Sequence, residues 1–289
     1  MIDVLLIAAA LFILGGLLIF AASLLPATSS TARELWPFYR SEFLIVGAIL
    51  LPSAADGWVF LSVLVMLSLR GQWELFTLFG QSSKTLLSVV GMAAGAGLVV
   101  AGMLAPERLP IGALAAVILL VLVGRLNLSR TWLTIASLVF PSLAVALIGI
   151  LRDSSQGFVW LVLAQAAVET NDSFALLIGK LIGQTRPFPR LSSGKTLAGL
   201  VGGLTAGLLA GLVVCRLLLG LSYFAAFAAT IVALTAGIAG DLLLSALKRR
   251  LHVKDFPPLA LMHGGLLDIY DSLLFAAPAL LVLRSGLRL

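Results

Sequence analysis

Residues 2–25 read IDVLLIAAALFILGGLLIFAASLL and contain one charged residue, Asp3. A transmembrane helix needs about 20 mostly apolar residues, so this stretch is long enough to cross a bilayer. Similar stretches recur to the end of the chain, in which 61% of the 289 residues are hydrophobic and 11% are charged. A soluble core of this size could not bury so much apolar surface. The sequence therefore predicts an all-α, polytopic integral membrane protein.

Apolar segments bounded by charges, Pro or Gly predict about ten transmembrane helices. The segments lie at about 3–25, 43–51, 58–69, 85–104, 110–124, 131–151, 158–182, 196–215, 223–247 and 264–283. The second and third are short and are separated by Pro52, Ser53 and Asp56, so they form either two tilted helices or one re-entrant pair. The alternative count is nine.

The basic residues lie in short loops between the apolar segments and give the chain a net charge of +6. Because they do not gather on one polar face, we expect no nucleic-acid partner, and anionic lipid and a polyphosphate are the expected partners. Basic loops face the cytoplasm in membrane proteins, which places the loops at 180–195 and 248–254 there and predicts a multi-pass protein of the inner (cytoplasmic) membrane. The single Cys215 forms no intrachain disulfide.

The acidic residues divide the chain into two regions. In residues 1–156 the acids fall at expected helix ends or in loops, where a charge costs little, and this region is expected to provide scaffold and lipid access. In residues 157–289 five of the six acids fall inside expected helices or at the helix mouths: Glu169, Asp172, Asp241, Asp268 and Asp271. An ionised group at membrane depth costs several kcal/mol unless it is paired, hydrated or metal-bound. We therefore expect 157–289 to be the catalytic region.

Asp268 and Asp271 are three residues apart on the last expected helix, which would place both carboxylates on one face. A divalent cation can hold two neighbouring carboxylates ionised, and oxygen ligands favour Mg2+. Asp241, on the preceding helix, is the expected third ligand. The alternative is an acid cluster that is neutralised by Lys248 or Arg249 and serves only packing.

Three further groups of polar residues predict substrate contacts. Asn171 and Asp172 follow Glu169 on an earlier helix, although such residues also join helices by hydrogen bonds. Ser192, Lys195 and Thr196 precede a Gly-rich helix whose N-terminus would favour phosphate. His263, Gly264 and Gly265 open the last helix, where a substrate could approach the backbone. The run at 193–196 is no Walker motif, because its first glycine is replaced by Pro189.

The segment 245–272 resembles the signature of the phosphatidate cytidylyltransferase (CDP-diacylglycerol synthase) family with every spacing kept. The matching residues are Ser245, Lys248, Arg249, Lys254, Asp255, His263, Gly264, Gly265, Asp268 and Asp271. Upstream matches are Asn171, Asp172, Gly179, Gly183, Ser192, Lys195, Thr196, Gly199, Gly202, Gly203, Gly240 and Asp241, with a weaker element at Trp73 and Glu74. The resemblance covers residues 157–280 well.

This resemblance implies Mg2+-dependent transfer of CMP from CTP to phosphatidic acid, which forms CDP-diacylglycerol and pyrophosphate. It assigns Asp241, Asp268 and Asp271 to the metal. The implied phosphate-binding cations are Lys195, Lys248, Arg249 and Lys254, and Asn171, Asp172, Asp255 and His263 complete the site. It also implies a homodimer.

Departures from the family pattern keep other functions open. Ile269 and Ala198 replace a cation and an acid that the family commonly has, which leaves a related transferase acting on an isoprenoid or other lipid phosphate, or a catalytically impaired paralogue. A transporter also uses intramembrane acids. However, it should show internal repeats, and the intramembrane acids lie in one half only.

Overall fold

A computed structural model describes residues 2–24, 29–125, 127–189, 192, 194–259 and 264–287. All regular secondary structure within these ranges is helical. The first half contains α1 (Ile2–Leu24), α2 (Ser29–Ala54), α3 (Gly57–Leu78), α4 (Leu86–Leu104), α5 (Leu109–Gly124), α6 (Leu128–Ser137) and α7 (Ala144–Asp153). The second half contains α8 (Gly157–Ile182), α9 (Leu197–Leu217), α10 (Tyr223–Arg250), α11 (Leu266–Ile269) and α12 (Leu273–Leu287).

The helices have the length and surface of membrane spans. Seven spans within the described ranges are long and apolar enough to cross a bilayer, with α6 and α7 counted as one interrupted span. Large apolar side chains face outward, such as Leu86, Ile111 and Phe224, where lipid replaces water. The prediction of an all-α, polytopic membrane protein is confirmed, whereas the count of nine or ten spans stays a prediction.

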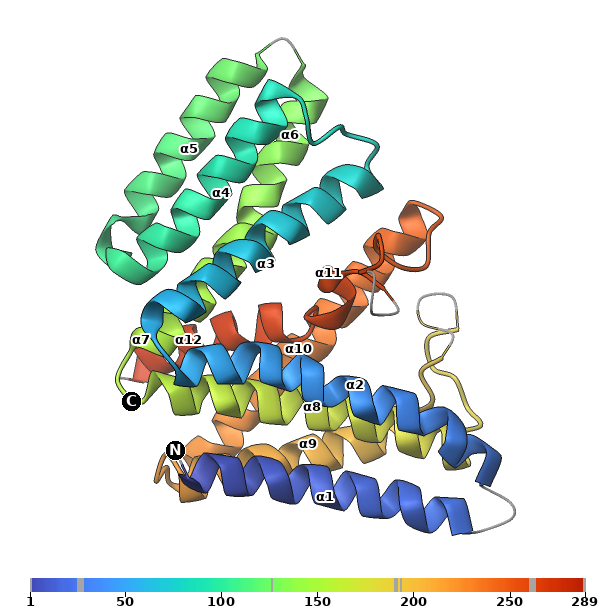
Figure 1. The fold of residues 1–289 in the computed structure, drawn as a ribbon. Helices are drawn as coiled ribbons and strands as arrows, with labels where there is room; N and C mark the ends of the chain where they lie inside the picture. Colours follow the sequence, from blue (N-terminus) through green and yellow to red (C-terminus); the bar gives the residue numbers. More distant parts are fainter. Residues whose placement is uncertain are drawn as a thin grey trace.

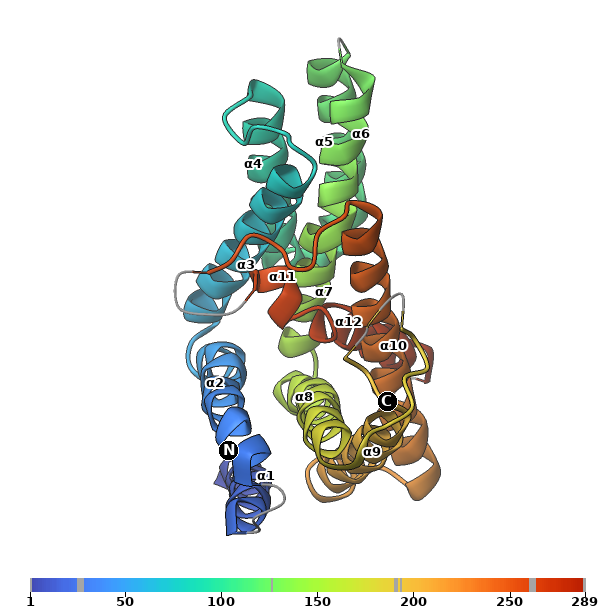
Figure 2. The same cartoon turned by 90° about the vertical axis from the view of Figure 1, so that its right-hand side faces the viewer.

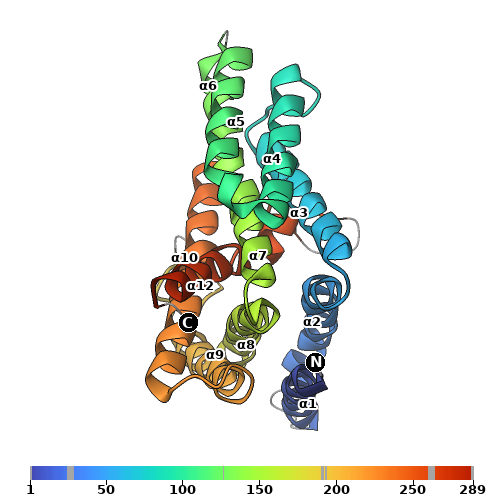
Figure 3. The ribbon, with the colours of Figure 1, turned by 90° about the vertical axis from the view of Figure 1, so that its left-hand side faces the viewer.

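The helices form two bundles, and a third group of C-terminal helices lies between them. In Figure 1, α1, α2, α8 and α9 run side by side along the bottom, and α3 to α6 form the upper bundle. The helices α10, α11 and α12 lie between them. Figure 2 shows α11 between α3 and α10, and Figure 3 shows α12 beside α7. The segment that follows α10 therefore contacts both bundles.

Small residues let α9 pack directly against the backbone of α8. A Cβ atom added at Gly199, Gly203 or Gly207 would lie 2.5–2.6 Å from a backbone carbonyl oxygen of α8. This spacing of four residues keeps the glycines on one side of α9. The close contact fixes the position of α8, which carries Asn171 and Asp172.

The second and third predicted helices are longer than the hydropathy pattern indicated. The helix α2 begins at Ser29 and α3 extends to Leu78, so Glu42 and Glu74 lie inside helices. The expectation that these acids sit at helix ends or in loops was wrong. A helix continues through a charge when the fold supplies a partner, and Glu74 has one in Arg70, four residues earlier.

The last predicted helix, 264–283, is broken into α11 and α12, with Asp271 in the break. The Asp271 Oδ1 atom accepts a hydrogen bond from the Ser272 amide at 2.7 Å. Such local side-chain to backbone bonds compete with helical hydrogen bonding. The prediction that Asp268 and Asp271 share one face of a continuous helix is therefore wrong.

Candidate active site

Carboxylates from three separate elements converge at the centre of the molecule. Asp172 lies on α8, Asp241 on α10 and Asp271 in the break before α12. Each of the three interacts electrostatically with at least one of the other two. The Ser272 hydroxyl lies 3.2 Å from Asp172 Oδ2 and 3.3 Å from Asp271 Oδ1, and its one proton is shared between these two acceptors. One hydroxyl thus ties α8 to the start of α12.

Two lysines lie among these acids. Lys195, just before α9, forms an ion pair with Asp241, and Lys248, on α10, forms one with Asp268. Lys248 also attracts Asp271. The side chains of Lys248 and Asp268 are only 10% and 12% exposed. The alternative interpretation of the sequence, in which Lys248 neutralises the acid cluster and serves packing, is therefore met in part: among the described residues Lys248 forms an ion pair with Asp268.

Asp268 organises the backbone around it. Its Oδ2 atom accepts hydrogen bonds from the amides of Phe256 at 2.7 Å and Gly265 at 2.8 Å, while Oδ1 bonds to Lys248. Gly264 has φ +101°, a conformation that glycine adopts without strain. The glycines predicted for substrate approach are thus also needed for this turn.

Glu74 and Arg70 were missed as site residues by the charge pattern. The Glu74 carboxylate, buried in α3, accepts from the amides of Leu266 at 2.7 Å and Leu267 at 2.9 Å. Arg70 donates to Glu74 at 2.8 Å and also bonds to the loop after α10. The weak resemblance at Trp73 and Glu74 was the only sequence signal for this contact.

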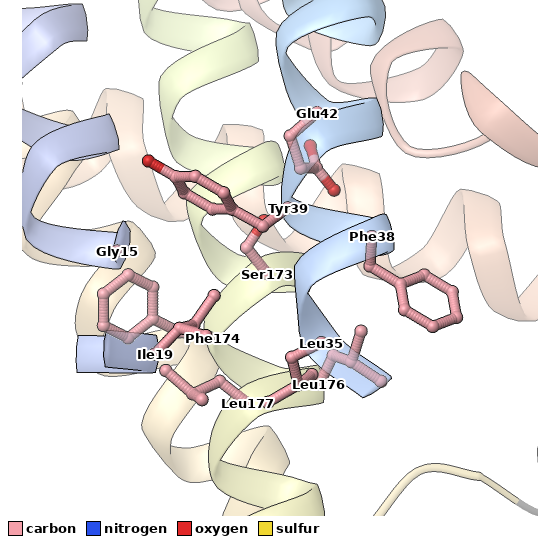
Figure 4. Close-up of a pocket in the computed structure, with 10 residues that line it drawn as sticks. All are labelled: Gly15, Ile19, Leu35, Phe38, Tyr39, Glu42, Ser173, Phe174, Leu176 and Leu177. Atoms are coloured by element: carbon pink, nitrogen blue, oxygen red, sulfur yellow. The ribbon is translucent and has the colours of Figure 1, made fainter. Parts of the chain in front are cut away.

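A second missed acid lies between α2 and α8. The carboxyl group of Glu42 lies beside that of Glu169, within hydrogen-bonding reach, and both interact with Asp172. Glu42 and Ser173 also line a mostly apolar crevice between α1, α2 and α8 (Figure 4). This pair brings two more carboxyl groups to the edge of the site.

The residues predicted to bind substrate divide into central and peripheral groups. Asn171 is 5% exposed and donates to Asp172 at 2.8 Å, while its own Oδ1 atom has no partner among the described residues. Thr196 caps α9 by accepting from the Gly199 amide at 3.1 Å, which gives it a structural role. Ser192 lies in the preceding loop, where its carbonyl accepts from the Lys195 amide.

The basic loop after α10 lies outside this centre. Arg249, Lys254 and Asp255 are exposed to solvent, and an Arg249 nitrogen donates to the Val253 carbonyl. The structure does not bring these three to the carboxylates. His263 lies outside the described residues, so its predicted place in the site stays a prediction.

The carboxyl groups of the centre outnumber its basic side chains, so either bound protons or a further cation must offset the excess negative charge. Six carboxyl groups face only two lysines: Glu42, Glu169, Asp172, Asp241, Asp268 and Asp271 against Lys195 and Lys248. Nevertheless, no three acids, histidines or cysteines of the described residues are arranged to hold a metal ion by themselves. Mg2+ commonly takes only one or two carboxylates and leaves other positions to water and substrate phosphates. The donor set fits that kind of binding.

This fold and site define a polytopic membrane protein with an acid-rich centre and two buried or half-buried lysines. The chain belongs to the cytidylyltransferase family, whose model matches residues 4–286. The family predicted from the signature at 245–272 is therefore confirmed, and with it the transferase class of enzyme.

Individual relatives match parts of the chain. The Escherichia coli (strain K12) protein YnbB is 40% identical over 124 residues, which are 43% of this chain and 42% of that protein. Phosphatidate cytidylyltransferase of Aquifex aeolicus (strain VF5) is 37% identical over 108 residues, 37% of this chain and 40% of the relative. That of Staphylococcus aureus (strain COL) is 30% identical over 171 residues, 54% of this chain and 62% of the relative. The matches thus span less than two thirds of each relative.

Proposed function

We propose that this protein transfers CMP from CTP to phosphatidic acid, forming CDP-diacylglycerol and pyrophosphate, with Mg2+ as cofactor. The observation that supports it most is the convergence of Asp172, Asp241 and Asp271 with Lys195 and Lys248 at one centre. Two relatives carry the name phosphatidate cytidylyltransferase. The basic loops favour a site that opens to the cytoplasm of the inner membrane, where CTP is present.

Mg2+ would be held by Asp241 and Asp271, with Asp172 beside them. Asp268 was predicted as a further ligand, but two backbone amides and the buried Lys248 hold it, so we assign it to the turn that precedes Asp271. Asp241 accepts from the side chains of Lys195 and Ser245, which a cation can displace. When bound, the ion would act as a Lewis acid at the triphosphate.

The protein side chains supply positioning and charge compensation. The attacking oxygen of phosphatidic acid is already anionic, so the reaction needs no strong general base. Lys195 and Lys248 would hold the phosphates and offset the charge that develops on pyrophosphate as it leaves. The free Oδ1 atom of Asn171 is an acceptor for a hydroxyl or amino group of the substrate.

The test is incorporation of radiolabel from CTP labelled in the α-phosphate into lipid by the purified protein. Phosphatidic acid and an isoprenoid phosphate are supplied in parallel, each with Mg2+ and with EDTA. We expect Mg2+-dependent labelling of phosphatidic acid. Labelling of the isoprenoid phosphate alone would show that the substrate is an isoprenoid phosphate and not phosphatidic acid. No labelling with either lipid would support an impaired paralogue. Light scattering of the detergent-solubilised protein tests the homodimer that the family resemblance implies.

A further inference from the structure

The segment after α10, here called the signature loop, is held in place by a helix from the other half of the chain. The structure describes residues 251–259 and 264–272 of this loop. Glu74, on α3, is fully buried and accepts the Leu266 and Leu267 amides, one on each carboxylate oxygen. A buried carboxylate is stable only where donors satisfy it, and these two amides and Arg70 provide them.

Arg70 holds the other arm of the same loop. Its Nη2 atom donates to the carbonyl oxygens of Pro257 at 2.9 Å and Pro258 at 3.2 Å. Its Nε atom donates to Glu74, and the guanidinium lies over the Trp73 ring at 4.2 Å. The planar guanidinium suits this arrangement, since it can address several acceptors at once. The Arg70–Glu74 pair thus bonds to both arms of the signature loop.

The opposite side of the loop is fixed by α10. Lys248 pairs with Asp268, which in turn accepts the Phe256 and Gly265 amides. The loop therefore lies between α3 and α10, as Figure 2 shows for α11. Asp271 follows only three residues after Asp268, so its position depends on both supports.

The fit between α3 and the loop leaves no spare room. A Cβ atom at Gly265 would lie 2.6 Å from Glu74 Oε2 and 2.6 Å from the Phe256 Cβ atom. On α3, a Cβ atom at Gly71 would lie 3.0 Å from a methyl group of Leu267. A shift of α3 by the width of a methyl group would therefore move the loop or break its hydrogen bonds.

We infer that Arg70 and Glu74 are positioning residues that set Asp271 against Asp172 and Asp241, and that α3 is in this way part of the catalytic apparatus. This inference rests on the proposed function for its effect on turnover. The sequence had assigned residues 1–156 to scaffold and lipid access, so the inference adds a catalytic duty to that region. Neither residue touches the substrate in this account.

The test uses Glu74→Gln and Arg70→Lys in the full-length protein. The glutamine would place an NH2 group against a loop amide, and the lysine cannot bond to Glu74 and two carbonyls together. We expect kcat per folded protein to fall about 10- to 100-fold, because small misplacements are that costly, with KM for CTP changed less than about threefold. Glu34→Gln, an exposed acid on α2 paired with Lys180, is the matched control and should change neither.

Hydrogen exchange of the signature loop, measured without substrate, tests the clamp, meaning the bonds from Arg70 and Glu74 to the loop, independently of the proposed reaction. We expect amides 264–272 to exchange faster in both variants while the rest of α3 and α10 stays protected. Unchanged exchange in this segment, or unchanged kcat with faster exchange, would overturn the inference. If Glu74→Gln does not fold, Arg70→Lys alone decides it. If the wild type makes no lipid product, the proposed function fails, while the exchange result still judges the clamp.

Discussion

Replacing Asp271 by Asn removes one charge from the centre while the size and shape of the side chain stay almost the same. Asp271 is 8% exposed and its Oδ1 atom accepts from the Ser272 amide, a bond that the Asn oxygen can keep. Asp271 faces like charges on Asp172 and Asp241. At a separation of about 5 Å and an effective dielectric constant of about 20, each like charge costs about 3 kcal/mol. Without cation, the variant should therefore be at least as stable as the wild type.

The same charge should be essential once cation and CTP bind. At the same separation and dielectric constant, a carboxylate and a divalent cation attract each other by more than about 3 kcal/mol. Losing that attraction corresponds to a loss of at least about 100-fold in rate. We would measure CTP-dependent lipid labelling and thermal unfolding, with and without Mg2+. Glu107→Gln removes an exposed acid that pairs with the exposed Arg108 and serves as the control. More than a tenth of wild-type turnover in Asp271→Asn, or a marked drop in its cation-free stability, would refute the reasoning.

Three further changes have distinct expected results. Lys248→Met should lower the free energy of unfolding by about 3 kcal/mol, because it leaves Asp268 buried without its partner. A lower unfolding temperature in detergent would show this loss. Gly265→Ala should cost about 1–3 kcal/mol and reduce turnover, since the added methyl group meets Glu74; a fully active, equally stable variant would contradict this packing. Thr196→Val removes the cap of α9 and should cost about 1 kcal/mol with KM for CTP unchanged, so a large rise in KM would show direct substrate contact.

The sequence was sufficient to locate the centre of the site, because an acid within an apolar segment is recognisable from the sequence and is unfavourable in a membrane unless it has a function. Asp172, Asp241 and Asp271 stood out as charges inside apolar segments, and the structure brings them together with Lys195. Their spacing could not show that the last helix breaks. At that break the Ser272 amide donates to Asp271 Oδ1, a local bond that competes with helical hydrogen bonding.

Glu74 and Glu42 show where this reasoning stops. Both lie beside polar or charged residues, so a hydropathy pattern assigns them to helix ends. Their burial depends on partners distant in the sequence, namely the Leu266 amide for Glu74 and the Glu169 carboxyl group for Glu42. Such partners appear only when the chain is folded.

The ion pair between Lys195 and Asp241 has a thermodynamic consequence for the proposed reaction. As long as the pair is closed, the lysine is unavailable to a phosphate and the carboxylate is partly neutralised against a cation. A nucleotide that draws Lys195 away would release Asp241 for the cation, and a cation on Asp241 would release Lys195 for the nucleotide. Linkage requires both effects to be equal, so CTP should tighten Mg2+ binding by the same factor by which Mg2+ tightens CTP binding.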